Sequence, residues 1–129
     1  MTAPPHHGHS PSGPVKMILI VNNGLKMGKG KIAAQVGHAS VQATLKAGEN
    51  NPLALQAWLS SGQKKVCLKG DDADHLLALE KEAKEAGLLT SKVHDAGHTQ
   101  IPSGSLTVLA IGPCQDELVE KITGTLKLL

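Results

Sequence analysis

A short run of apolar residues, KMILIV at 16–21, constrains the fold more than any other part of this sequence. The run is continuous rather than alternating, and the turn-forming residues Asn22, Asn23 and Gly24 end it. This pattern is typical of a β-strand that is buried on both faces of a sheet. Helices must then cover both faces, which favours a layered α/β architecture.

The rest of the chain alternates between helical and strand-like patterns. We expect a helix from about residue 30 to 47 and a shorter one that ends at Gly62, followed by a strand at 64–70. Asp71, Asp72 and Asp74 predict the start of a third helix, and Gly87 predicts its end. Strands at 90–95 and 105–112 and a last helix at 114–124 complete the order β-α-α-β-α-β-β-α.

The connections between the strands predict the sheet. Helices join the first three strands, so right-handed crossovers should lay these strands parallel. The loop AGHTQIPSG before the fourth strand contains no helix, which leaves that strand free to run antiparallel. We expect a three-layer α/β/α sandwich on a small mixed, mostly parallel four-stranded sheet, formed by one domain at 16–129. The segment 1–15 is rich in Pro, Gly, Ser and His, which predicts a disordered tail.

Charge is distributed unevenly along the chain. Residues 1–48 contain five lysines and no acid, whereas residues 49–129 contain eight lysines and eleven acids. Clustered positive charge attracts polyanions, so the N-terminal part is the candidate binding region. Arginine is absent, which excludes bidentate guanidinium recognition of phosphates or guanines. Trp58 is the single residue among Phe, Tyr and Trp, which disfavours binding of single strands by stacking on several aromatic rings.

Several classes of protein are disfavoured by features that the sequence lacks. Cys67 and Cys114 form neither a CxxC pair nor a zinc spacing, and we expect both to be reduced thiols. No apolar run has the length of a signal-peptide core or of a membrane span, so the cytosol is the expected location. A G-x-S-x-G motif and a spaced set of metal ligands are both missing, and we expect no metal and no other cofactor.

The segment GLKMGKGK after the first strand is a candidate anion-binding site. A helix N-terminus offers unpaired N–H groups and a partial positive charge, and Gly28 and Gly30 would let a phosphate approach the backbone. Lys26, Lys29 and Lys31 would add mobile positive charges. A P-loop is disfavoured because the spacing G-x4-G-K-[ST] is not met, and a solvated lysine loop is the commoner explanation for such a motif alone.

Side chains of the helix that follows separate into two stripes when residues are turned by 100° each. The apolar stripe should face the sheet, and it consists of Ile32, Val36, Ala39, Ala43 and Ala47. The neighbouring polar stripe would line a groove at the sheet edge, and it consists of Lys31, Gln35, His38 and Gln42. For Gln35 and His38 the alternative is a hydrogen bond to a nearby loop.

Asp95 lies at the carboxyl end of the third strand, and ligands of open sheets bind at that edge. Because the first strand ends at the same edge, we expect Lys31 and Asp95 to line one anion-receptive cleft. Asp95 could orient a water or the Lys31 ammonium, and Thr99 could position the same group. The alternative is an aspartate that bonds to backbone amides of its own turn. At its ordinary pKa of about 3.9, Asp95 would be a weak base at neutral pH.

Three segments resemble the archaeal and eukaryotic type of peptidyl-tRNA hydrolase: KMILIVNNGLKMGKGKIAAQVGHASVQA, DAGHTQIPSGSLTVLAIGP and DELVEKITGTLKLL. The resemblance covers roughly residues 16–129, and the paired KMGKGK and DAGxTQ motifs carry it. It implies hydrolysis of the ester between a peptide and the 3′ end of tRNA, with peptidyl-tRNA as the partner molecule and homodimers as a common assembly. A non-catalytic RNA-binding or protein adaptor on the same scaffold is the alternative.

The resemblance also implies a role for individual residues. The catalytic residues would be Lys31, Asp95 and Thr99. The residues that bind substrate or tRNA would be Lys26, Gly28, Lys29, Gly30, Gln35, His38 and Gln100. In one respect the chain departs from the family, because members commonly have Arg-x-Asp where this sequence has Asn22, Asn23 and Gly24. Either an ion pair has been lost as a unit, or an arginine that contacts RNA is missing.

Overall fold

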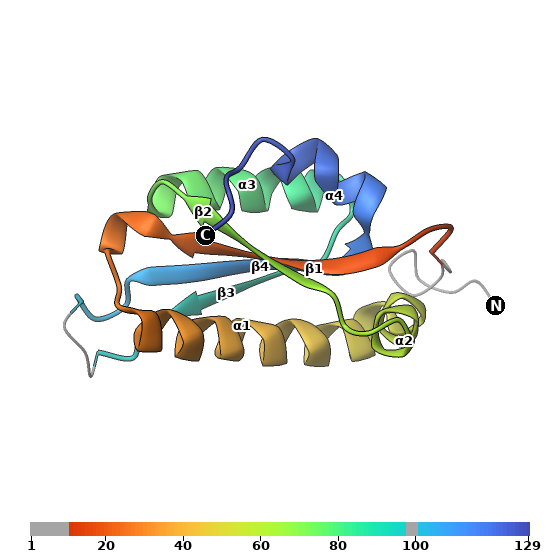
Figure 1. Cartoon of the computed structure of the whole chain (residues 1–129), viewed down its shortest axis with the longest axis horizontal. Coiled ribbons are helices and arrows are strands. Elements are labelled where there is room, and N and C mark those ends of the chain that lie inside the picture. The colour runs from red at the N-terminus through yellow and green to blue at the C-terminus, as the bar shows by residue number, and fades with distance from the viewer. Residues whose placement is uncertain (1–10, 98–100) are drawn as a thin grey trace.

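The computed structural model describes residues 11–97 and 101–129 (Figure 1). The order of elements expected from the sequence is confirmed. The strands and helices are β1 (Val15–Asn22), the 3₁₀ turn η2 (Asn23–Leu25), α1 (Lys29–Asn50), α2 (Pro52–Ser60), β2 (Lys65–Gly70), α3 (Ala73–Glu85), β3 (Thr90–His94), β4 (Leu106–Gln115) and α4 (Asp116–Thr123).

The four strands form one mixed sheet in the order β2-β1-β4-β3. β1 pairs in parallel with β2, and β4 pairs antiparallel with both β1 and β3. It follows that β1, β2 and β3 point in the same direction, as expected for strands joined through helices. Three of the four strands thus point in the same direction. Most neighbouring pairs are nevertheless antiparallel, because β4 lies between β1 and β3.

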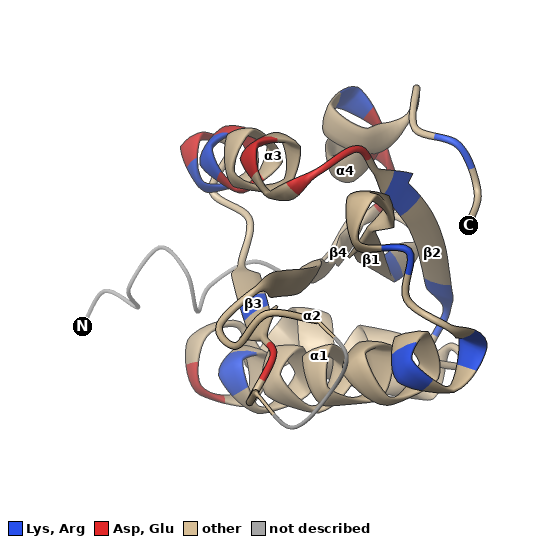
Figure 2. Ribbon diagram, turned by 90° about the vertical axis from the view of Figure 1, so that its left-hand side faces the viewer, with Lys and Arg blue, Asp and Glu red and all other residues tan. Residues whose placement is uncertain are grey.

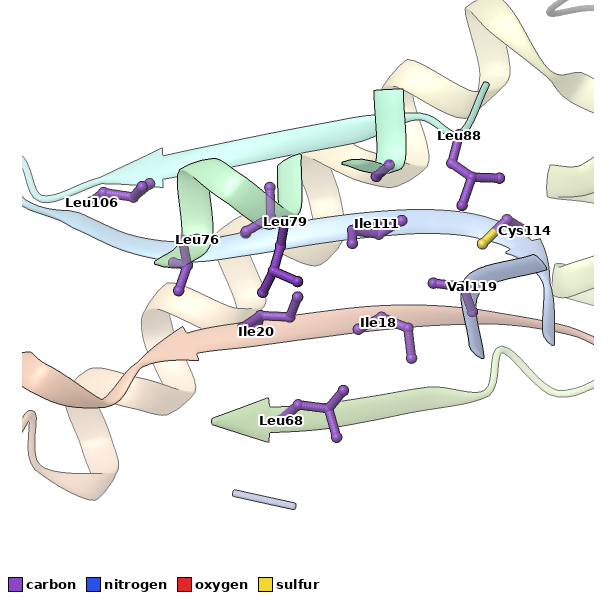
Figure 3. Close-up of a cluster of buried hydrophobic side chains, with 12 residues drawn as sticks. Ile18, Ile20, Leu68, Leu76, Leu79, Leu88, Leu106, Ile111, Cys114 and Val119 are labelled. Atoms are coloured by element: carbon purple, nitrogen blue, oxygen red, sulfur yellow. The ribbon is translucent and has the colours of Figure 1, made fainter. Parts of the chain in front are cut away.

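Helices cover both faces of the sheet, as the doubly buried first strand predicted (Figure 1). α1 and α2 lie on one face, and α3 and α4 on the other. Along β1, Ile18 and Ile20 point to the α3 and α4 face, where they meet Leu76 and Leu79 (Figure 3). The alternate residues of β1 form a second core with α1 and α2, whose buried members are Val15, Met17, Leu19, Val21, Ala39, Ala43, Trp58, Val93, Val108 and Ala110.

The ends of α3 agree with the sequence prediction. The Asp72 side chain accepts a hydrogen bond from the His75 N–H at 2.8 Å and so caps the first turn. At the other end Gly87 has a φ of +78°, in the left-handed region that glycine adopts without strain. Its N–H donates to Lys84 O, and the next N–H donates to Ala83 O, which together form a Schellman motif.

Both ends of the described chain pack against the sheet. The Pro14 carbonyl accepts from the Asp116 N–H at 2.9 Å, so the last residues of the expected tail are in contact with α4. The rest of that tail, residues 1–10, lies outside the described residues. After α4, the chain returns along β2, where Leu128 forms an antiparallel bridge with Leu68. Within the described residues, no helix is long and apolar enough to cross a membrane.

Candidate active site

The N-terminus of α1 is open towards solvent. Gly28 is the N-cap and has no side chain to bond the first N–H groups, and the first turn contains no acidic residue. A Cβ added at Gly28 or Gly30 would meet no atom within 4 Å, so the packing of the protein does not require glycine there. Within the described residues, N–H groups without a capping side chain, small residues and lysines thus occur together at this turn, which is the arrangement that suits an anion.

Lys31 and Asp95 form an ion pair across the carboxyl edge of the sheet. The Lys31 Nζ lies 2.5 Å from the Asp95 Oδ1, although 64 positions separate the two residues in the chain. The Asp95 side chain is 1% exposed, whereas the Lys31 side chain is 22% exposed. The ammonium therefore borders solvent, and the carboxylate lies behind it. The two residues therefore meet at this edge, as expected, while the anion-receptive cleft expected between them stays a prediction.

The backbone around Asp95 is fixed by several hydrogen bonds. Its N–H donates to Ser105 O at 2.8 Å, and its carbonyl accepts from the Gly104 N–H at 2.9 Å. The second carboxylate oxygen, Oδ2, accepts from the Gly97 N–H at 3.0 Å. Asp95 thus bonds to an amide of its own turn, as the alternative reading proposed, and also holds Lys31.

Gln35 lies one helical turn after Lys31 and is buried, with 5% of its surface exposed. Its Oε1 lies 2.6 Å from the Thr107 Oγ1, which is also 3.0 Å from the carbonyl of Val93. The Gln35 side chain thus bonds to β4 rather than lining an open groove. Sequence reasoning missed Thr107, whose only signal was a hydroxyl in the otherwise apolar strand segment LTVLAI.

The other members of the expected site are at the surface or outside the described residues. His38 and Gln42 are exposed on α1, so the expected polar stripe divides into a buried part and a solvent-facing part. Lys26 and Lys29 are also exposed and form no ion pair with any described residue. Thr99 and Gln100 lie outside the described residues.

The described part of the chain has cavities away from the Lys31–Asp95 pair. One of about 460 Å³ lies at the opposite end of the sheet, where Asn51 follows α1 and Gln115 ends β4. Another, of about 260 Å³, lies between α1 and α2 beside Trp58. Groups of three or more His, Cys, Asp or Glu suited to a metal ion do not occur within the described residues.

Comparison with known proteins identifies the family. The sequence model of the family described as Peptidyl-tRNA hydrolase PTH2 matches residues 15–129. The chain belongs to this family.

Individual relatives agree with this assignment. The chain is 49% identical over 115 residues to the peptidyl-tRNA hydrolase of Methanocaldococcus jannaschii, an alignment that covers 89% of this chain and all of the relative. It is 52% identical over 117 residues to the human mitochondrial peptidyl-tRNA hydrolase 2, covering 91% of this chain and 65% of the relative. The relative from Thermococcus onnurineus is 43% identical over 114 residues, covering 88% of this chain and 97% of that protein.

The departure from the PTH2 pattern at residues 22–24 lies in a tightly packed turn. Asn22 is buried, its Nδ2 donates to Leu106 O at 2.9 Å, and its Oδ1 accepts from the Gly24 N–H at 3.0 Å. A Cβ on Gly24 would lie 2.8 Å from the carbonyl oxygen of Asp71. Asn22 and Gly24 therefore form one hydrogen-bonded turn, and this turn packs against the backbone just before α3. Replacing Asn22 with arginine would remove these hydrogen bonds.

Proposed function

We propose that this protein hydrolyses the ester bond between a peptide and the 3′ end of tRNA, with Lys31 and Asp95 at the reacting centre. The observation that carries the proposal is the ion pair between these residues at the open N-terminus of α1, in a chain of the PTH2 family. The relatives whose names state this activity align over nearly the whole described chain, which supports the same reaction here.

The exposed side of the pair faces the substrate in this proposal. Water attacks the ester carbonyl carbon, and the Lys31 ammonium donates hydrogen bonds to the oxygen on which negative charge develops. The bond to the ribose oxygen then breaks, the ribose oxygen receives one proton of the attacking water, the other proton passes to solvent, and a peptide carboxylate and a free tRNA are released. No covalent intermediate with the protein is formed.

Asp95 is a positioning residue in this mechanism. Its carboxylate is buried and contacts Lys31 on the side away from solvent. A pre-oriented ammonium needs no reorganisation as charge develops on the substrate, which is the main benefit of a fixed electrostatic site. Thr99 would add a positioning hydrogen bond, and His38 and Gln100 would border the substrate; these roles rest on the family resemblance. Gln35 is buried against Thr107 and would instead hold α1 in place behind the site.

The N-terminus of α1 would hold phosphate near the ester. The free N–H groups after Gly28, together with Lys26 and Lys29, would bind phosphates at the 3′ end of tRNA. Because lysine acts as a point charge, this contact would be insensitive to base sequence. The cytosol is the proposed location, whereas the name of the human relative places that protein in mitochondria.

An assay with two substrates separates an enzyme from an adaptor. The protein should release tRNA from N-acetylated aminoacyl-tRNA and act much more slowly on aminoacyl-tRNA with a free amino group, because the blocked form resembles a peptide. A non-catalytic adaptor would release neither at a rate above that of buffer. Binding of tRNA without any release of the blocked substrate would overturn the proposed function.

A further inference from the structure

A pair of lysines outside the candidate active site occupies the carboxyl end of β2. The Lys69 N–H donates to Lys127 O at 2.9 Å, and the Leu129 N–H donates to Cys67 O at 3.0 Å. With the antiparallel bridge between residues 68 and 128, these bonds place Lys69 directly opposite Lys127. Side chains that lie directly opposite each other in such a pair share one face of the sheet.

The two ammonium groups repel each other and have no acidic partner among the described residues. Both side chains are exposed, and none of the ion pairs in the described part of the chain includes either lysine. Like charges directly opposite each other destabilise a strand pair. Lysines often protect an exposed sheet edge from pairing with another chain, but here residues 127–129 already occupy that edge. Edge protection therefore does not explain Lys69.

The lysine pair faces the same side of the sheet as the α1 N-terminus. Along β2, Leu68 points into the core under α3, so Lys69 points to the opposite face, where α1 begins. Lys69 is paired with Val21, one residue before the end of β1, and η2 packs beside β2 before the chain reaches Lys26. Figure 2 shows lysine on β2 and on the C-terminal segment, while acidic residues gather on α3 and the turn before it.

We propose that Lys69 and Lys127 form a second RNA-binding surface, which contacts backbone phosphates of the tRNA arm that carries the 3′ end. This inference rests on the proposed function, since the ester at Lys31 fixes where the arm begins. A chain with no arginine must use lysines as point charges, and such contacts hold a duplex without reading its bases. The surface would extend the contacts of Lys26 and Lys29 from the 3′ end to the duplex.

The test compares a full tRNA substrate with a short one in the variant Lys69→Gln, Lys127→Gln. The short substrate is an N-acetylated aminoacyl ester of the trinucleotide CCA, which lacks the duplex arm. With full N-acetyl-aminoacyl-tRNA, we expect the variant to raise KM about tenfold and to leave kcat within twofold of wild type. With the short substrate, both constants should remain unchanged. Lys81→Gln is the control for each single variant, Lys69→Gln and Lys127→Gln, because Lys81 is an exposed lysine on α3 and each single change removes one positive charge.

Two physical measurements accompany the kinetics. The slope of log affinity for tRNA against log salt should become shallower by about 1.4 to 1.8, which corresponds to two lost phosphate contacts. The melting temperature should stay the same or rise, because the variant removes a like-charge pair. A fall in melting temperature together with equal loss on both substrates would show a structural role and overturn the inference.

The outcomes distinguish this inference from the proposed function. If wild type cleaves the full substrate but the double variant matches it in KM and in salt slope, the RNA surface is wrong and the proposed function stands. If wild type binds tRNA with these two lysines contributing but cleaves neither substrate, the proposed function is wrong and the surface stands. An equal effect of Lys81→Gln would also overturn the inference, since it would indicate a general effect of net charge.

Discussion

At the scale of single residues, two polar contacts join the first two turns of α1 to the strands beneath it. Lys31 reaches Asp95 after β3, and Gln35 reaches Thr107 on β4. Both contacts lie on the same side of the helix because residues four apart are neighbours on its surface. The second contact is fully buried, so it fixes the depth and rotation of α1 immediately below the ion pair.

Replacing Thr107 with valine tests this buried contact. The change preserves volume but leaves the buried Gln35 amide without its partner, so we expect the free energy of unfolding to fall by about 1–3 kcal/mol. Urea denaturation measures the change. Thr123→Val is the control, because the Thr123 Oγ1 bonds to Val119 O within its own helix and its loss should cost less. Equal stability of Thr107→Val and wild type would contradict a role for this contact.

At the scale of elements, local patterns predicted what each segment would be but not how the strands would pair. The caps of α3 and the apolar stripe of α1 are readable because they depend on residues within one or two turns. The insertion of β4 between β1 and β3 depends on contacts between distant segments, which no local pattern contains. The burial of Gln35 escaped prediction for the same reason, since its partner Thr107 lies 72 positions away.

The close approach of α3 to the sheet makes a prediction at this scale. A Cβ on Gly70 would overlap Leu76 Cδ1 and lie 3.0 Å from Ile20 Cγ2, and both neighbours are buried. Gly70→Ala should therefore lower the free energy of unfolding by about 1–3 kcal/mol through overpacking. In the control Gly37→Ala, nothing lies within 4 Å of the new methyl group, and helix propensity should raise stability by about 0.5–1 kcal/mol. A rise in the stability of Gly70→Ala would contradict the close contact between Leu76 of α3 and Gly70 of β2.

At the scale of the whole molecule, the two cores meet at the sheet, and the candidate active site lies at one end of it. Cys114 lies at the other end, near the close of β4. Burial, with a smaller contribution from the charge of Asp116, raises the pKa of the Cys114 thiol from an ordinary 9.0 to about 12. The ionisation of this thiol therefore reports on unfolding of the sheet. Cys114 takes no part in the proposed reaction.

The raised pKa predicts a loss of stability in alkali. Below pH 9 the thiol is protonated in both the folded and the unfolded chain, so it adds no pH dependence. Between pH 9 and 12 the unfolded chain loses this proton and the folded one keeps it, so stability falls as pH rises. From pH 8 to pH 10 the free energy of unfolding should drop by about 1 kcal/mol more in wild type than in Cys114→Ala. Parallel pH profiles of the two proteins would contradict a buried, protonated thiol.

In the proposed mechanism Lys31 and Asp95 act as one unit on the ester, and a double-mutant cycle on kcat/KM measures whether they do. Lys31→Ala should lower kcat/KM on N-acetyl-aminoacyl-tRNA by about 10²–10³ fold, the cost of losing one preorganised donor to the developing oxyanion. Asp95→Asn should also lower kcat/KM, because this substitution removes the negative charge that holds the Lys31 ammonium in place. If the two residues act together, the double variant should be no slower than the slower single variant. Losses that multiply in the double variant, or full activity of Lys31→Ala, would show that the two residues do not act together on the ester.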